Sequence, residues 1–247
     1  MKTFFLGLIL FFLLSLGLIP VGMYFSHDVR VLKTDYPHII KKEKDGPEFE
    51  IKSGIPNNWV KLEHISKLGK WAIVISEDWG FYQHEGVDLN QVKIALTEMW
   101  EDQKFRGAST ISQQMVKNVF LSSDRTLWRK LHEVILTKKV ENELSKERIL
   151  EIYLNCIEFG PGIYGIKEAS YHYFQKHPGL LSAKEGAFLA MLLPSPKRYY
   201  VSFKKKELTP FAQERINTIL TKLRMARVLT MEELEAEKEI PLSWETI

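Results

Sequence analysis

Three clusters of polar residues carry side chains that could act on a substrate, and the first directly follows the apolar run 71–75. It contains the adjacent acids Glu77 and Asp78, with Phe81 and His84 a few residues later. A carboxylate at the point where a buried segment meets a loop is partly desolvated, which raises its pKa and makes it a better proton acceptor near neutral pH. Two acids that begin a solvated turn would give the same pattern, so this cluster alone leaves both interpretations open.

The second cluster, residues 106–118, combines hydroxyl and amide side chains with cations. If the segment is helical, Thr110, Gln114 and Lys117 share one face at positions i, i+4 and i+7, and apolar residues occupy another face. A helix N-terminus that carries hydroxyls is suited to bind an oxyanion such as phosphate. An amphipathic helix with a serine cap is the plainer interpretation, but two glutamines beside Ser and Thr favour a functional face.

The third cluster places Arg125, Arg129 and Glu133 at intervals of four residues along one expected helix, with Lys130 beside them. Intrahelical ion pairs of this kind are common and contribute only about 0.2 to 0.5 kcal/mol. Taken alone, the spacing therefore indicates an ordinary helix surface. The Glu133 carboxylate could take part in chemistry if the fold places it across a cleft from the first cluster.

Helix start and stop signals dominate the chain beyond residue 58, and they predict a mostly α fold. Ser, Thr and Asp precede the apolar segments, and these side chains accept hydrogen bonds from the first backbone N–H groups of a helix. The exception is the run 71–75, whose five residues fit a short strand or a buried helical turn equally well. The expected helices begin at Asp88, at Ser109 (to Leu121), at Asp124 (to Leu144), at Ser145 (to about Asn155), at Ser182 (to Pro194), at Thr209 and at Thr230.

The composition of the 247 residues, 45% hydrophobic and 26% charged, is that of a folded protein and excludes a disordered or low-complexity chain. The formal net charge of +3 gives no reason to expect a nucleic acid partner. Cys156 is the only cysteine, so an intrachain disulfide is impossible, and no Cys or His spacing resembles a zinc site. We expect Cys156 to be a buried thiol.

The N-terminal segment from Phe4 to Phe25 contains no charged residue. As a helix it would extend roughly 33 Å, which is enough to cross a bilayer. A cleaved signal peptide is the alternative, but the apolar stretch is long for one and no small-x-small cleavage signature follows it. We therefore expect an uncleaved anchor in residues 1–26, followed by a juxtamembrane connector, residues 27–57, that shows no helical period.

Several long motifs follow one another in the chain. They read Glu77-Asp78-x-x-Phe81-x-x-His84-x-Gly86-x-Asp88, Gly107-Ala108-Ser109-Thr110-Ile111-Ser112-Gln113-Gln114-x-x-Lys117-Asn118, Arg129-Lys130-x-x-Glu133, Ser145-Lys146-x-x-Ile149-Leu150-Glu151-x-Tyr153-Leu154-Asn155 and Glu158-Phe159-Gly160-x-Gly162-x-Tyr164-Gly165. In type and order they resemble the motifs of the family 51 peptidoglycan glycosyltransferases, over roughly residues 58–205. Departures from the family pattern are mild: Ala108 stands where a second Gly is usual, Ser112 where Thr is usual, and Gln175 where Gly is frequent.

The resemblance implies a lysozyme-like helical lobe with a smaller membrane-associated lobe and one N-terminal transmembrane helix. Residues 58–205 would form the glycosyltransferase domain and residues 206–247 the C-terminal helices. Roughly forty residues follow the last motif, so we expect the monofunctional type. In the implied reaction, the 4-hydroxyl of a GlcNAc on lipid II attacks the anomeric carbon of a lipid pyrophosphate-linked donor chain. A β-1,4 linkage forms with inversion, and undecaprenyl pyrophosphate leaves.

By the same resemblance, Glu77 is the general base, and Glu133 assists the leaving group as an acid, a metal-linked carboxylate or an orienter of cations. Lys117 and Arg129 would bind the pyrophosphate, while Phe81 and His84 would form a wall of the site. No cofactor is required and no metal ligand is assigned, although a divalent cation such as Mg²⁺ at the pyrophosphate is compatible with the reaction. The expected substrate-binding residues are Asp78, Phe81, His84, Ser109, Thr110, Gln113, Gln114, Lys117, Asn118, Arg129 and Lys130.

The partners implied by the resemblance are lipid II, the growing glycan chain and the membrane, with cell-wall synthesis or division proteins as further candidates. Lipid II is polymerised on the outer face of the cytoplasmic membrane, which would place the N-terminus inside and residues 27–247 outside. Two other functions stay open: a lysozyme-like glycan-cleaving enzyme and an inactive, membrane-anchored scaffold that binds lipid II. The cations and glutamines of the second cluster favour the polymerase, because hydrolysis releases no pyrophosphate.

Overall fold

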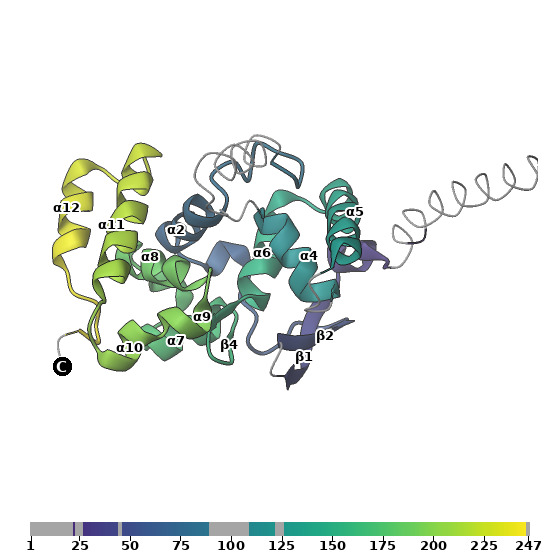
Figure 1. Ribbon diagram of the computed structural model, residues 1–247, viewed down its shortest axis with the longest axis horizontal. Helices are drawn as coiled ribbons and strands as arrows, with labels where there is room; N and C mark the ends of the chain where they lie inside the picture. Colours follow the sequence, from purple (N-terminus) through teal and green to yellow (C-terminus); the bar gives the residue numbers. More distant parts are fainter. Residues whose placement is uncertain (1–21, 23–26, 44–45, 89–108, 122–125, 246–247) are drawn as a thin grey trace, which may run out of the picture.

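The computed structural model describes residue 22 and residues 27–43, 46–88, 109–121 and 126–245. Within these ranges the chain is mostly α-helical with two small two-stranded sheets (Figure 1), which confirms the predicted class. Cys156 is a buried free thiol, as predicted. The expected anchor in residues 1–26 and the expected helix from Asp88 lie almost entirely outside the described residues. No helix in the described ranges is long and apolar enough to cross a membrane.

The described helices and strands do not lie in chain order along the molecule. Figure 1 shows the first hairpin at one end and the last two helices at the other. In chain order the elements are η1 (Val29–Lys33), β1 (Tyr36–Glu43), β2 (Gly46–Lys52), η2 (Leu62–His64), α2 (Lys67–Glu77), α4 (Ile111–Phe120), α5 (Leu127–Glu143), α6 (Lys146–Cys156), β3 (Glu158–Gly160), β4 (Ile163–Tyr164), α7 (Ile166–Phe174), η3 (Pro178–Leu180), α8 (Ala183–Leu192), α9 (Pro196–Tyr199), α10 (Val201–Lys205), α11 (Pro210–Met225) and α12 (Met231–Glu239).

The apolar run 71–75 lies in α2, so of the two predicted alternatives the helical one is correct. Ser66 caps this helix by accepting a hydrogen bond from the Gly69 N–H. Residues 72–75 are all buried, because α2 packs against both α8 and α11. Five consecutive apolar residues fit a buried strand and a buried helical turn equally well, which is why the run 71–75 alone could not identify the helix. The last residue of α2 is Glu77.

Every residue of α8 is buried, which makes this helix the centre of the core. Gly186 of α8 lies so close to α2 that a Cβ at this position would be 2.7 Å from the Gly69 Cα. Two helix backbones can approach this closely only where neither carries a side chain. The contact fixes the separation of α2 and α8, and with it the position of Glu77 relative to the core.

A carboxylate from α12 closes the N-terminus of α8. The Ala183 N–H and the Lys184 N–H donate hydrogen bonds to Glu237 at 3.2 and 2.7 Å. Ser182 Oγ donates to the same carboxylate at 3.0 Å. Helix N-termini leave several backbone N–H groups without intrahelical partners, and here a distant part of the chain supplies the acceptor.

The expected connector, residues 27–57, contains a hairpin that the sequence analysis missed. Strands β1 and β2 pair antiparallel, with Glu43 opposite Gly46 at the turn. The hairpin is attached to α6, because the Arg148 guanidinium donates to two backbone carbonyls that precede β1, each at 2.8 Å. An Asp-Gly pair at positions 45–46 is a hairpin signal that the search for a helical period did not consider.

The capping residues differ from the prediction at two helices. The cap of α4 is Thr110 instead of Ser109, because Thr110 and Gln113 form a reciprocal capping box one residue further on. The cap of α5 is Thr126, and the predicted cap Asp124 lies outside the described residues. Four other predicted caps are confirmed, Ser145, Ser182, Thr209 and Thr230, while the helix expected from Asp88 lies almost entirely outside the described residues.

We predict that Glu237→Ala lowers the free energy of unfolding by about 2 to 3 kcal/mol, because it leaves buried donors at the start of α8 without an acceptor. The matched control is Glu235→Ala on the same helix, where the side chain is exposed and, among the described residues, pairs only with Lys238. That variant should change stability by about 0.5 kcal/mol or less. Urea denaturation followed by circular dichroism measures both, and equal losses would contradict the role of Glu237.

Candidate active site

Glu77, the expected general base, lies where α2 ends and a loop begins. Its Oε2 accepts a hydrogen bond from Gln114 Nε2 at 3.0 Å, and Gln114 Oε1 accepts one from the Tyr153 hydroxyl at 3.1 Å. Burial raises the pKa of Glu77 above its usual value, while the Gln114 hydrogen bond and the charge of Arg215 act in the opposite direction. A carboxylate with a raised pKa is suited to accept a proton near neutral pH.

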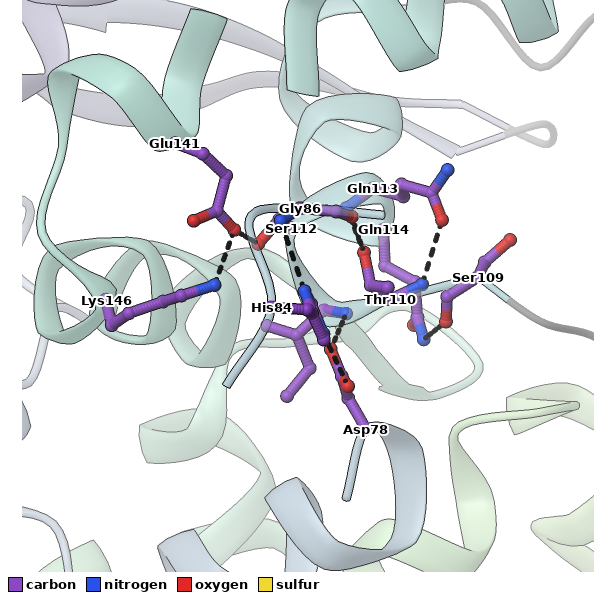
Figure 2. Close-up of polar contacts among 11 residues, drawn as sticks. Asp78, His84, Gly86, Ser109, Thr110, Ser112, Gln113, Gln114, Glu141 and Lys146 are labelled. Atoms are coloured by element: carbon purple, nitrogen blue, oxygen red, sulfur yellow. Dashed lines mark hydrogen bonds and ion pairs between the residues drawn. The ribbon is translucent and has the colours of Figure 1, made fainter. Parts of the chain in front are cut away.

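Asp78, the neighbour of Glu77, is buried and connects the end of α2 to the start of α4 (Figure 2). Its Oδ2 accepts a hydrogen bond from the N–H of Ile111, the first residue of α4, at 3.0 Å. Its Oδ1 lies 2.9 Å from His84 Nε2. His84 Nδ1 accepts a hydrogen bond from the Gly86 N–H at 3.1 Å, so Nε2 is the nitrogen that donates to Asp78. The helix dipole also favours a negative charge at this position.

Thr110 and Gln113, expected to hold substrate oxygens, are buried and bonded within the protein. Thr110 Oγ1 donates to the Gly86 carbonyl at 2.6 Å and accepts from the Gln113 N–H at 3.2 Å. Gln113 Oε1 accepts from the Thr110 N–H at 3.0 Å. Gly86 has a φ of +84°, and a Cβ there would lie 2.8 Å from Glu141 Cγ. The loop can lie this close to α5 only because residue 86 is glycine.

A second buried network joins α4, α5 and α6, and the sequence analysis missed it. Ser112 Oγ and Lys146 Nζ both donate to Glu141 Oε1, the lysine at 2.8 Å (Figure 2). Lys146 Nζ also lies 4.6 Å from the centre of the Phe81 ring, which is fully buried. Phe81, expected to form a wall of the site, therefore supports the loop from inside. The three polar residues come from three helices, so no local pattern groups them.

Glu133 is buried on α5, and cations of the same helix bind both of its carboxylate oxygens. Arg129 Nη1 lies 2.7 Å from Oε2, and Lys130 Nζ donates to Oε1. Lys130 Nζ also lies 3.4 Å from Ser109 Oγ, just before α4. Arg129, Lys130 and Glu133 therefore form the expected intrahelical pairs, and Lys130 joins them to the second cluster, whereas Arg125 lies outside the described residues.

A chain of hydrogen bonds connects the two glutamates expected to act in catalysis. Glu77 binds Gln114 Nε2, which lies 3.5 Å from the Ser109 carbonyl. Ser109 Oγ binds Lys130, and Lys130 binds Glu133. Residues from all three polar clusters of the sequence thus form one continuous site.

Lys117 and Arg129, the expected pyrophosphate ligands, differ in how accessible their donor groups are in the described part of the chain. Lys117 is exposed on α4 and forms no ion pair with a described residue. Arg129 binds Glu133 through Nη1, but its buried Nε has no hydrogen-bond partner among the described residues. Asn118, next to Lys117, is half-buried. Since α4 and α5 contact each other, the exposed Lys117 and the partly exposed Arg129 lie on neighbouring helices.

One grouping in the described ranges has the spacing of a metal site. Ligand atoms of Asp78, His84 and Asp88 lie within 4.8 Å of one another. Hydrogen bonds already engage this group, because His84 Nε2 and the Ile111 N–H both donate to Asp78. At Glu133, both oxygens bind cations. In the described residues, Asp78 and Glu133 are thus bonded to donors and cations of the protein itself.

A family model and individual relatives point to the same family of proteins. Residues 48–224 match the family model for Transglycosylase. A biosynthetic peptidoglycan transglycosylase of Nitrosomonas eutropha is 40% identical over 175 residues, which cover 70% of each chain. Proteins of the same name from Aeromonas hydrophila and Methylobacillus flagellatus are 43% and 42% identical, over 65% and 64% of this chain and 67% of each relative.

We predict that Lys146→Met lowers the free energy of unfolding by about 3 to 5 kcal/mol, because it leaves the buried Glu141 charge without its cation. The control is Lys138→Met on α5, where the lysine lies 3.6 Å from Glu85 and both side chains are at least half exposed. This exposed pair should contribute about 1 kcal/mol or less. Urea denaturation compares the two variants, and a small loss in Lys146→Met would show that Glu141 finds another partner.

Proposed function

Since this chain belongs to the transglycosylase family and is thus a peptidoglycan glycosyltransferase, we propose that it builds glycan chains from lipid II. The observation that carries the proposal is the hydrogen-bonded chain from Glu77 through Gln114 and Ser109 to the pair Lys130–Glu133. It unites a proton acceptor with a cationic region. Transfer of a sugar from a pyrophosphate carrier needs both groups in one site.

The proposed reaction forms one bond and breaks another at the anomeric carbon of the donor. The 4-hydroxyl oxygen of the acceptor GlcNAc attacks this carbon and loses its proton to Glu77. The bond between the anomeric carbon and the pyrophosphate oxygen breaks, and the electron pair leaves with undecaprenyl pyrophosphate. Attack from the side opposite the leaving group inverts the configuration and gives the β-1,4 linkage.

Glu77 suits the role of general base for two reasons. A sugar hydroxyl is a weak nucleophile, so a carboxylate within hydrogen-bond reach should take its proton. Burial raises the pKa of Glu77, which increases its basicity, and the bond to Gln114 engages only Oε2. The other oxygen has no hydrogen-bond partner among the described residues and can receive the hydroxyl of the acceptor.

Lys117 and Arg129 would stabilise the pyrophosphate as its negative charge grows. Of the three roles left open for Glu133, orientation of cations fits the geometry best, because both of its oxygens bind Arg129 and Lys130. A protonated Glu133 would lose one of these ion pairs. We therefore propose that Glu133 holds the two cations in place for the leaving group.

The other expected substrate-binding residues divide into two groups by their contacts. Ser109, Asn118 and Lys130 are exposed or only partly buried, and we propose that they contact sugar or phosphate oxygens, whereas Gln114 binds the base Glu77. We propose that the second group holds the site in shape and does not contact substrate. Its polar side chains bond within the protein, and the ring of its one phenylalanine is buried. This group is Asp78, Phe81, His84, Thr110 and Gln113.

We propose that a divalent cation such as Mg²⁺, if it takes part, binds together with the pyrophosphate of the substrate. The described residues offer no open set of carboxylates for it, since cations already bind Glu133. When bound with substrate, such an ion would neutralise phosphate charge. The proposed steps depend on Lys117 and Arg129 for that purpose.

The proposed location is the outer face of the cytoplasmic membrane, with an anchor in residues 1–26. The uncharged segment from Phe4 to Phe25 supports the anchor, and it lies almost wholly outside the described residues. At the start of α5, Leu127 is 90% exposed and Trp128 is 53% exposed. Apolar side chains so exposed beside the site suit a lobe that contacts lipid.

We predict that Glu77→Gln lowers polymerisation of purified lipid II by about 10² to 10⁴ fold, because the amide keeps the volume of the side chain but cannot accept the proton. Circular dichroism should show an unchanged fold. Glu85→Gln is the control, since Glu85 lies in the following loop with an 88% exposed side chain. Near-normal turnover by Glu77→Gln at saturating lipid II would exclude Glu77 as the base.

Removal of the cations should weaken both donor binding and turnover, because the pyrophosphate is charged in the ground state and more so as it leaves. We expect Lys117→Ala and Arg129→Ala each to lower kcat/KM by about 10 to 100 fold. Lys138→Ala, which removes an exposed lysine from α5, is the control. If Arg129 served only its ion pair with Glu133, activity would be unchanged in Arg129→Ala.

A further inference from the structure

Tyr153 is a fully buried residue of α6 to which the proposed mechanism gives no role. Its hydroxyl donates a hydrogen bond to Gln114 Oε1 at 3.1 Å. Burial, with the nearby charges of Glu77 and Asp78, raises the pKa of this phenol well above its usual value of 10. The hydroxyl therefore keeps its proton throughout the neutral range and is a constant donor to the residue that binds the base.

The amide of Gln114 has three polar neighbours, and together they favour one orientation. The ionised Glu77 carboxylate and the Ser109 carbonyl, 3.0 and 3.5 Å from Nε2, can only accept hydrogen bonds. On the other side of the amide, the Tyr153 hydroxyl donates to Oε1. A flipped amide would place Oε1 against two acceptor oxygens and leave a buried O–H without its acceptor, which is unfavourable.

Several groups around Glu77 act on its ionisation in opposite directions. Burial favours the protonated form, and the neighbouring charge of Asp78 adds to this effect. The Gln114 N–H and the charge of Arg215 on α11 favour the carboxylate. A general base must be ionised before it can accept a proton. The orientation of the Gln114 amide therefore influences the fraction of enzyme that is ready to react.

We propose that Tyr153 is a positioning residue, which holds the Gln114 N–H toward Glu77 and so keeps that carboxylate in place as a hydrogen-bond acceptor. The proposal rests on the proposed function of Glu77 as general base. Tyr153 is buried and acts through Gln114, so its loss should change the pH dependence and kcat while KM stays the same. A purely structural role would lower stability without these changes.

The test is Tyr153→Phe in the full-length chain, with two readouts. One is the pH dependence of kcat/KM for polymerisation of purified lipid II, and the other is a ¹³C NMR titration of the Glu77 carboxyl carbon, assigned through Glu77→Gln. Without the hydroxyl, the Gln114 amide can turn its oxygen toward a protonated Glu77, which raises the pKa. We expect both midpoints to move to higher pH by about half to one unit.

Tyr173→Phe is the matched control, because the same change removes another buried hydroxyl. Tyr173 donates to the Phe159 carbonyl at 2.8 Å and has no contact with Gln114 or Glu77 among its hydrogen bonds. We expect a similar loss of stability with no shift of either midpoint. An unshifted Glu77 titration in Tyr153→Phe, matching Tyr173→Phe, would overturn the proposal.

A double-mutant cycle with Gln114→Leu tests whether the effect passes through the amide. Gln114→Leu should shift the Glu77 midpoint in the same direction, and Tyr153→Phe should then add nothing in that background. Additive shifts would overturn the proposed route. If Tyr153→Phe does not fold, Gln114→Leu still tests the route through the amide: an unshifted Glu77 titration overturns the proposal.

The two proposals fail in different ways. Absence of polymerisation by the unsubstituted chain would refute the proposed function, and the NMR titration would still decide the link between Tyr153 and Glu77. Normal polymerisation with an unshifted Glu77 midpoint in Tyr153→Phe would refute the positioning role alone.

Discussion

The site depends on one carboxylate, that of Asp78. It accepts hydrogen bonds from the first N–H of α4 and from His84, and so joins the last turn of α2 to the first turn of α4. This bridge sets the relative position of Glu77 and Gln114, which lie on the two helices it connects. The interaction is favourable because backbone N–H groups and the dipole at a helix N-terminus both attract a negative charge.

Burial separates the polar residues of the motifs into two groups, those that bond within the protein and those that face the substrate. Buried polar groups need hydrogen-bond partners. The loop after α2 and helices α4, α5 and α6 supply them to one another, for instance through Thr110 with Gly86 and Ser112 with Glu141. Donors that remain open, such as those of Lys117, are then the ones a substrate can use. Polar residues of similar chemical type thus have different roles: the buried ones hold the site together, and the exposed ones can contact substrate.

The sequence predicted those helix starts that depend on hydrogen bonds between residues close together in the chain. Caps such as Ser145 act within a few residues of the helix start, so most helices of the described ranges could be recognised. Helix α2 could not, because its five consecutive apolar residues fit a buried strand as well as a buried helical turn. The motifs identified which residues gather at the site, but they could not separate Thr110, which caps α4, from Ser109 beside it. That distinction depends on hydrogen bonds such as those to Gly86, which join positions far apart in the chain.

The cap on α8 also constrains the order in which this protein can mature. The most deeply buried helix obtains the acceptor for its first N–H groups from Glu237, 53 residues after Lys184. While the chain is being synthesised, the ribosome must release that later segment before the central helix has all its hydrogen bonds. A nascent chain interrupted before α12 would contain nearly the whole site and still lack a finished core. The finished core therefore cannot form before the segment that carries Glu237 has been synthesised.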